Sequence, residues 1–491
     1  MRASGILMPV SALPSDFGIG TFGEKAYDFI DFLSDSRQHY WQILPLGHTG
    51  YGNSPYQCFS AFAGNPYYID PMILYESGYI EKNDIPFIIN DGRADYAGIY
   101  KERIKLLKKA ADAVDTLSSE YLSFEKDNSF WLADYALFMA VKEGCAMKPL
   151  KDWNTEIRIP GKEMSEILRI RYERSIRQWK AIQFLFFSQW KSLKSYANAR
   201  NIEIIGDLPI YVSADSCEMW LHNELFVIDE AGHPSLFSGC PPDGYSPLGQ
   251  LWGNPVYDWN YHRKTNYLWW IMRMKHSSSL YDVVRIDHFR GFEDYYAVDA
   301  DSQDAAHGKW YKGPSRDFID AVKRNVPEVR VIAEDLGNIT DKVRDLLCYS
   351  DFPGMKVLQF GLEGNDEFLP HSYTRHSVAY TGTHDNPTMK QWSLICEDES
   401  LSFAKKYLNV NNAESLVNDC IRVLFMSVSE TVIIPLQDWL ELGSEARMNV
   451  PSTACGNWDW RLSEDMLTQE LSQKIADTTR LYSRDCKEDN L

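Results

Sequence analysis

The amino-acid sequence predicts a closed (β/α)8 barrel, and three observations lead to that prediction. Eight short apolar runs occur along the chain, stretches with helical spacing lie between them, and no Gly-rich phosphate-binding loop follows the first run. The alternative is a doubly wound open sheet, which would usually carry such a loop at that position. At 491 residues the chain also has the length of an elaborated single-barrel enzyme.

The eight apolar runs have the features of buried parallel strands, because they are brief, rich in β-branched residues and apolar on both faces. They occupy residues 5–10, 40–45, 202–205, 283–286, 331–333, 355–360, 378–380 and 431–435. Most are followed by polar, Gly or Asp residues, and the carboxyl ends of parallel strands meet at one face of a barrel.

Helical patterns are clearest around the first and third runs. Thr21 and Glu24 have the spacing of a capping box, and apolar residues at 26, 29, 30 and 33 follow it. One apolar face of a long helix precedes the third run and comprises Trp179, Ile182, Phe186, Trp190, Leu193 and Ala197.

Two connections are too long for one helix and one loop, since such connections usually span only a few residues. We expect a mostly helical insertion near 75–165 after the second strand and an aromatic-rich insertion near 209–280 after the third. Both would lie at the face where barrel enzymes build their sites, so residues 1–491 are predicted to form a single catalytic domain.

Charge and cysteine content exclude several classes of function. The chain has 69 acidic and 50 basic residues, a net charge of -19, which disfavours nucleic acid and anionic membranes as partners. Nine cysteines without a CxxC motif suit a reducing cytoplasm. Neither a metal-ligand motif, a cofactor motif, a signal peptide nor a membrane-spanning run is evident, so we expect none. Aromatic residues make up 13% of the chain, which favours carbohydrate binding only slightly.

Carboxylates follow four of the predicted strands, and they are Asp207, Asp287, Glu334 and Asp385. Two opposed carboxylates suffice for glycosidic cleavage, one attacking or stabilising the anomeric carbon and the other protonating the leaving oxygen. The alternative is that each acidic residue merely caps the helix that follows its strand, and for any single one of the four this alternative is favoured. The capping explanation becomes weaker when four neighbouring strand ends all carry a carboxylate.

Arg285 lies two residues before Asp287 and therefore on the same face of its strand. We expect this guanidinium to keep Asp287 ionised, as a nucleophile requires. Glu334 has no basic neighbour in the sequence, which suits a carboxyl group that must hold a proton.

Segments along nearly the whole chain resemble the 4-α-glucanotransferase family known as amylomaltase or disproportionating enzyme, glycoside hydrolase family 77. They are GILMP at 5–9, GNSPY at 52–56, SAFAGNP at 60–66, PPD at 241–243, GQLWGNP at 249–255, RIDHFRG at 285–291, AEDLG at 333–337, THDN at 383–386, ARMN at 446–449 and GNW at 456–458. Each is short, but so many in one order are very unlikely by chance.

The resemblance implies a retaining double displacement without a cofactor, in which Asp287 is the nucleophile, Glu334 the general acid/base and Asp385 the third carboxylate. It further implies a substrate-binding set consisting of Tyr56, Asp207, Tyr245, Gln250, Trp252, Arg285 and His384. The substrates implied are an α-1,4-glucan donor and a glucose or maltooligosaccharide acceptor. The resemblance further implies that no separate C-terminal β-sandwich is present, which agrees with the short stretch of sequence after the last predicted strand.

Segment 241–256 is the candidate for an active-site lid, because Tyr245 and Trp252 are large rings on an otherwise turn-like segment. A lid that excludes water would favour transfer of the glucan to another sugar. A surface turn made by its Pro and Gly residues is the alternative. Two functional alternatives also stay open, namely a net α-1,4-glucan hydrolase and a non-catalytic glucan-binding protein.

Overall fold

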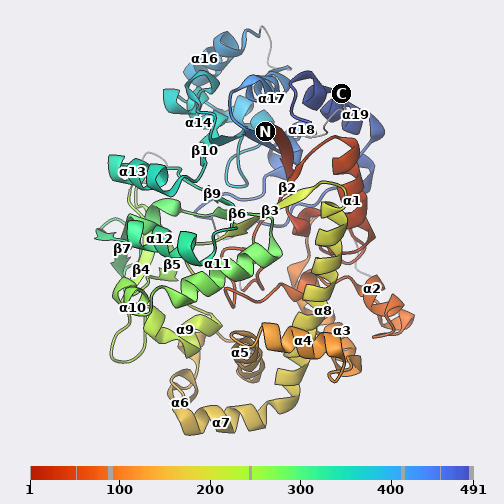
Figure 1. Cartoon of the computed structure of the whole chain (residues 1–491), viewed down its shortest axis with the longest axis vertical. Coiled ribbons are helices and arrows are strands. Elements are labelled where there is room, and N and C mark those ends of the chain that lie inside the picture. The colour runs from red at the N-terminus through yellow and green to blue at the C-terminus, as the bar shows by residue number, and fades with distance from the viewer. Residues whose placement is uncertain are drawn as a thin grey trace.

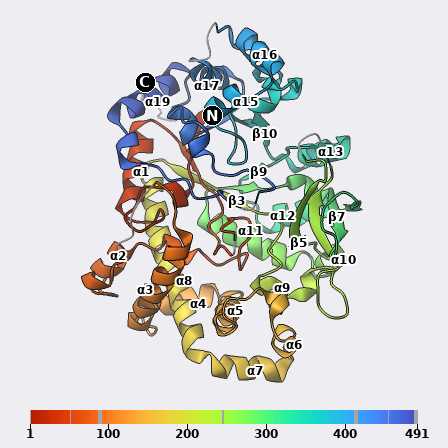
Figure 2. The same cartoon turned by 180° about the vertical axis from the view of Figure 1, so that it is seen from behind.

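The computed structural model describes residues 2–50, 52–86, 92–242, 246–410, 415–453 and 455–485. At its centre is the predicted barrel, seen from opposite sides in Figure 1 and Figure 2. No helix in these ranges is long and apolar enough to cross a membrane.

The barrel is closed by eight parallel strands in the order β1-β12-β11-β10-β9-β6-β3-β2. Their bounds are β1 Ala3–Leu7, β2 Tyr40–Gln42, β3 Glu203–Leu208, β6 Val283–Ile286, β9 Val331–Ala333, β10 Gly354–Val357, β11 Ser377–Tyr380 and β12 Thr431–Pro435. Each coincides with one of the eight predicted runs, which confirms the (β/α)8 barrel.

Three of the predicted runs leave the strand conformation before they end. The run at 355–360 becomes helix α14, Leu358–Leu362, directly after β10. The run at 5–10 is a strand only as far as Leu7, and the run at 40–45 only as far as Gln42. Short apolar runs carry no periodicity that separates a strand from a buried helical turn, so the sequence could not place these boundaries.

Helices cover the outside of the barrel. Those that follow its strands are α1 Glu24–Asp35, α11 Leu268–Leu280, α12 Arg316–Asn325, α13 Asp341–Ser350, α15 Met389–Ile395, α16 Asp398–Leu408, α17 Leu416–Met426, α18 Leu436–Trp439 and α19 Gln469–Leu481. The predicted capping box at the start of α1 is wrong. Gly23 is the N-cap residue, while the Thr21 hydroxyl donates to the Asp70 carboxylate (2.5 Å) from a distant segment.

The connection from β2 to β3 carries a group of helices: α2 Pro71–Glu76, α3 Tyr96–Ala113, α4 Ser119–Asp127, α5 Leu132–Gly144, α6 Thr155–Arg158, α7 Lys162–Arg171 and α8 Glu173–Asn198. Figure 1 shows α8 running from these helices up beside α1, and it packs on α1, α3 and α5. All six residues of the apolar face predicted for this helix are buried.

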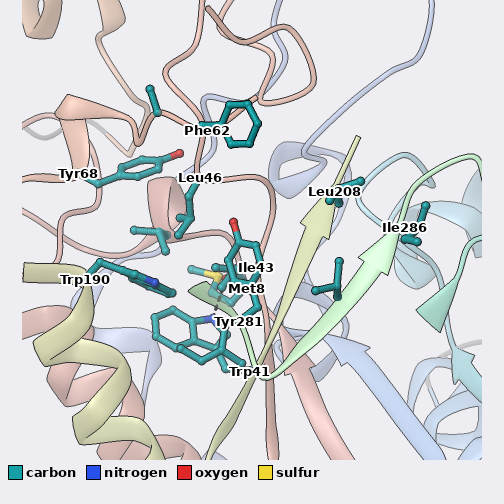
Figure 3. Packing of buried hydrophobic residues seen from close by; sticks show 14 of the residues in the cluster. Met8, Trp41, Ile43, Leu46, Phe62, Tyr68, Trp190, Leu208, Tyr281 and Ile286 are labelled. Atoms are coloured by element: carbon teal, nitrogen blue, oxygen red, sulfur yellow. Dashed lines mark hydrogen bonds between the residues drawn. The ribbon is translucent and has the colours of Figure 1, made fainter. Parts of the chain in front are cut away.

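Close packing joins α8 to the barrel wall. Figure 3 shows Trp190 of α8 beside Trp41 of β2 and Tyr281, which precedes β6. The Trp41 indole donates a hydrogen bond to the carbonyl of Met8 (2.8 Å). A Cβ at Gly206 would lie 2.1 Å from the Tyr281 ring, so only glycine allows this approach within β3.

A second sheet of four antiparallel strands, in the order β5-β4-β7-β8, lies beside the barrel mouth. It combines β4 Leu236–Cys240 and β5 Gln250–Pro255 with β7 Asp294–Asp299 and β8 Lys309–Lys312, and helices α9 Cys217–Leu221 and α10 Trp259–Lys264 flank it. In Figure 2 this sheet lies on the opposite side of the molecule from α2. The end of the predicted lid segment is therefore a strand. The strands that residues 294–312 add to this sheet were not predicted, because β4 pairs with a strand about sixty residues further along the chain.

Arg103 of α3 joins the helical insertion to the loop after β1. Its buried guanidinium donates to the carbonyls of Tyr67 (3.2 Å), Ile69 (2.6 Å) and Phe17 (3.0 Å). We expect Arg103→Met to lower the free energy of unfolding by about 3 kcal/mol, because two buried carbonyls and one partly buried carbonyl would lose their donor. Denaturant unfolding measures this. Arg174→Met, at a largely exposed side chain, should change it by less than about 0.5 kcal/mol, and equal effects of both substitutions would contradict the prediction.

Candidate active site

The barrel brings the predicted carboxylates to one mouth. Asp207 lies near the end of β3, Asp287 and Glu334 directly follow β6 and β9, and Asp385 lies in the loop after β11. In the register of the barrel, Asp207 stands opposite Arg285 on the neighbouring strand. Each position follows from where a buried apolar strand ends, as the sequence predicted.

Arg285 lies between two of these carboxylates. Its Nη1 donates to Asp207 Oδ2 at 2.5 Å and to Asp287 Oδ1 at 3.2 Å. Both Arg285 and Asp207 are almost completely buried, whereas 27% of the Asp287 side chain is exposed. The guanidinium is thus shared, with the shorter contact to Asp207.

This sharing corrects the prediction that Arg285 keeps Asp287 ionised. Burial raises the pKa of Asp287 well above its ordinary value, Arg285 opposes the shift, and three neighbouring carboxylates add to it. One cation cannot neutralise several like charges in one cavity, so simultaneous ionisation of all these carboxylates is disfavoured.

Glu334 is held by the backbone of two loops. Its Oε2 accepts from the amide of His288 (2.6 Å) and its Oε1 from the amide of Leu336 (2.8 Å). Burial raises the pKa of Glu334, while Arg285 and these two amides lower it. The net shift is upward, which favours the protonated form that a general acid needs. His288 has a left-handed backbone (φ 49°), which directs its amide toward Glu334.

Asp385 is the most exposed of the four, with 48% of its side chain accessible. Asn449 donates to its Oδ1 at 2.6 Å, and Arg447 donates to its backbone carbonyl at 2.9 Å. His384 Nε2 lies 3.4 Å from its Oδ2. Asn449 and Arg447 were not predicted as site residues, although both lie in the ARMN segment that supports the resemblance.

Tyr56 and His384 form one wall of the site. Their rings stack with centroids 5.2 Å apart, and the Tyr56 hydroxyl lies 2.9 Å from His384 Nε2 and donates to Asp207 Oδ2 at 2.8 Å. Trp458 packs against both rings. Apart from the GNW segment, no feature of the sequence indicated Trp458, because about 400 residues separate it from Tyr56.

The second sheet supplies Trp252, whose ring packs edge-on against His288 with centroids 4.8 Å apart. Gln250 lies two residues earlier on β5 and accepts a hydrogen bond from the Trp252 indole at 3.2 Å. Gln57, beside Tyr56, donates to the Trp252 carbonyl (3.2 Å) and so joins this strand to the opposite wall. Tyr245, predicted with them, lies outside the described residues.

Asp438 lies beneath the loop that carries His384 and Asp385. It accepts hydrogen bonds from the Thr381 hydroxyl (2.5 Å) and the Met389 amide (2.7 Å), one at each end of that loop. Burial raises the pKa of Asp438 to about 6. Asp438 was not predicted to support the site, because it lies in a different segment, beyond β12.

The arrangement has the parts that glycosidic chemistry needs. Asp287 can attack a carbon, Glu334 can donate and recover a proton, and the Tyr56–His384–Trp458 wall offers aromatic surface to a sugar ring. Within the described ranges, no group of three or more His, Cys, Asp or Glu residues could hold a metal ion.

Comparisons with known proteins agree with this chemistry. Residues 8–468 match the model of the family described as 4-alpha-glucanotransferase. A 4-alpha-glucanotransferase from Clostridium butyricum is 45% identical over 485 residues, covering 97% of this chain and all of the relative. One from Streptococcus pneumoniae is 45% identical over 492 residues, covering 98% and 97%.

Solved structures give the same result. The amylomaltase from Streptococcus agalactiae in complex with acarbose superposes with a TM-score of 0.95 at 39% identity, covering 99% of this chain and 100% of that one. The amylomaltase from Corynebacterium glutamicum, at 17% identity, shares the fold with a TM-score of 0.79 over 97% of this chain and 75% of that one.

Asp438 generates a prediction about stability and pH. Its folded pKa of about 6 exceeds the ordinary 3.8, so its protonated form stabilises the fold below about pH 4. This contribution is lost as pH rises through 6. Two pKa units correspond to roughly 3 kcal/mol, so the free-energy advantage of wild type over Asp438→Asn should fall by about that amount between pH 4 and pH 7. Denaturant unfolding at both pH values measures it.

Asp351→Asn is the matched control, because it makes the same substitution at a side chain that is 88% exposed. A difference between wild type and Asp438→Asn that stays constant over this range would contradict the prediction.

Proposed function

Because the chain belongs to the 4-alpha-glucanotransferase family, we propose that it transfers α-1,4-glucan segments by a retaining double displacement at the barrel mouth. Transfer is the activity that the family and its full-length relatives are named for. The observation that carries the mechanism is the pairing of Asp287, beside Arg285, with Glu334, held by backbone amides of both loops.

In the first displacement, Asp287 Oδ attacks the anomeric carbon of the donor glucan and the glycosidic bond breaks. Glu334 transfers its proton to the departing oxygen, which leaves as the 4-hydroxyl of the released sugar. The product is a glycosyl ester on Asp287 and an ionised Glu334. Arg285 supports the step by favouring the ionised form of Asp287 before attack.

The second displacement reverses these roles. Glu334 removes the proton from the 4-hydroxyl of a glucose or maltooligosaccharide acceptor, and the oxygen attacks the anomeric carbon of the ester. The bond to Asp287 breaks, its carboxylate is restored and Glu334 is protonated again. Two inversions at one carbon retain the α configuration, so the transferred segment forms a new α-1,4 bond.

We assign the wall opposite the acid/base to binding of the sugar that becomes attached. Tyr56 and Trp458 supply ring faces for its C–H surface, while His384 and the half-exposed Asp385 supply hydrogen-bonding groups for its hydroxyls. Asp207 acts from beneath, because its buried carboxylate holds both the Tyr56 hydroxyl and Arg285. The acarbose in the Streptococcus agalactiae relative supports a saccharide ligand for this fold.

Trp252 and Gln250 are proposed to cover the reacting atoms as part of the lid. The position of Trp252 against His288 supports this role, since His288 directly follows Asp287. A lid matters because water competes with the sugar acceptor for the glycosyl ester.

Maltotriose distinguishes transfer from hydrolysis. We expect purified protein to convert it to glucose and a ladder of longer oligomers at a constant number of reducing ends, measured by chromatography together with a reducing-end assay. Asp287→Asn should lower the rate by at least about a thousandfold, because an amide cannot form the ester. Asp345→Asn, on the exposed side of α13, should leave it unchanged. Steadily rising reducing ends would instead identify a net hydrolase.

Trp252→Ala tests the lid. We expect the ratio of hydrolysis to transfer to rise about tenfold, because water would gain access to the ester while the carboxylates keep their positions. Phe237→Ala, in β4 of the same sheet, is a control for general loosening of the sheet, because Phe237 packs on a separate apolar cluster of that sheet. An unchanged ratio in Trp252→Ala, with the transfer rate preserved, would rule out a lid role for this residue.

A further inference from the structure

The loops that carry Asp287 and Glu334 are joined by hydrogen bonds just beyond their strands. The amide of Phe289 donates to the Glu334 carbonyl at 3.0 Å, and the amide of His288 donates to the Glu334 side chain at 2.6 Å. Both bonds use the backbone of the segment that directly follows Asp287. The geometry of that segment therefore determines where the two carboxylates lie relative to each other.

Arg290 is the next residue of this segment with a side chain that reaches across to the second loop. Its Nη1 donates to the carbonyl of Asn338, in the loop that begins with Glu334. Its Nη2 donates to Asp294 Oδ1 of β7 at 2.5 Å. Its guanidinium carbon lies 4.1 Å from the ring centroid of Trp310 of β8. The side chain is 5% exposed.

Each contact of Arg290 thus belongs to a different element: the loop after β9, strand β7 and strand β8. We propose that Arg290 is a positioning residue that sets the separation of Asp287 and Glu334 by bracing both loops against the second sheet. This inference rests on the proposed roles of the two carboxylates. Arg290 itself makes no contact with the reacting atoms and acts through the segment between Asp287 and Phe289.

The chemistry of the guanidinium suits this task. Its planar fork donates in two directions at once while its face packs on Trp310, so the three contacts determine both its position and its tilt. A lysine keeps the charge and can make one of the two hydrogen bonds, but it lacks the plane and the second arm. A misplacement of about 1 Å between catalytic groups can lower a rate about a hundredfold.

The inference also predicts a direction for the pH profile. The His288 amide lowers the pKa of Glu334, so loosening this segment should raise that pKa and move the basic limb of the profile to higher pH. The other charged groups that act on Glu334 are Arg285 and Asp287 from β6 and its loop, and the adjacent Asp335. None of these groups is itself substituted in an Arg290 variant.

Arg290→Met and Arg290→Lys in the full-length enzyme test the proposal with maltotriose as substrate. We expect kcat to fall up to about a hundredfold in Arg290→Met, with KM within about twofold, because Tyr56, His384 and Asp385 lie on other loops. Arg290→Lys should recover part of kcat. The basic limb of kcat/KM should move to higher pH in Arg290→Met.

Arg316→Met is the matched control, because Arg316 also stacks on an aromatic ring (Tyr349, 4.6 Å) but is exposed and lies on α12. Thermal unfolding shows whether a variant has lost its fold or has only misplaced its catalytic groups. If Arg290→Met does not fold, Asp294→Asn tests the proposal instead, because it removes the charged partner of Arg290 on β7 and should also lower kcat.

The proposal would be overturned if Arg290→Met folds and keeps both the wild-type kcat and the wild-type basic limb of the pH profile. Where Arg290→Met fails to fold, an Asp294→Asn enzyme with wild-type kcat would overturn it. A fall in kcat of the same size in Arg316→Met would overturn it as well. Wild-type enzyme that is inactive on maltotriose would instead refute the proposed function, so the two failures are distinguishable.

Discussion

The site depends on one electrostatic constraint: a single buried guanidinium, Arg285, serves several carboxylates in one cavity. Parallel strands that end side by side place Asp207, Asp287 and Glu334 together, and like charges cannot all ionise there. Asp207 takes the shorter contact with Arg285. Full ionisation of the remaining groups is therefore disfavoured, which suits a site that needs one ionised and one protonated carboxylate.

Around this cluster, the supports come from outside the barrel. The loop of Asp385 is fixed by Asn449, Arg447 and Asp438, which all follow β12 in the chain. The loops of Asp287 and Glu334 are fixed by backbone amides and by the second sheet, through Trp252 and Arg290. A rigid scaffold of this kind matters because catalysis by paired carboxylates depends on their separation.

Differences between the expected and observed elements share one cause, which is that long-range contacts decide local structure. Thr21 and Glu24 have capping-box spacing, yet Thr21 bonds to Asp70 and the helix begins after Gly23. Residues 250–255 have the composition of a turn-rich loop, yet they form β5 by pairing with β4, which in turn pairs with β7. Local spacing carries no information about such partners.

By itself, the sequence determined the barrel and the strand-end positions of its carboxylates, because buried strands are recorded directly as apolar runs and the carboxyl ends of parallel strands meet at one face of a barrel. Its motifs likewise identified the family. Only the tertiary structure decided how charge is shared, since Arg285 bonds to Asp207 across the strands as well as to its neighbour Asp287. It alone also decided which distant residues, Trp458, Asn449 and Arg290 among them, complete and support the site. Contacts between residues tens to hundreds of positions apart depend on how the strands and loops pack, and no local pattern records that packing.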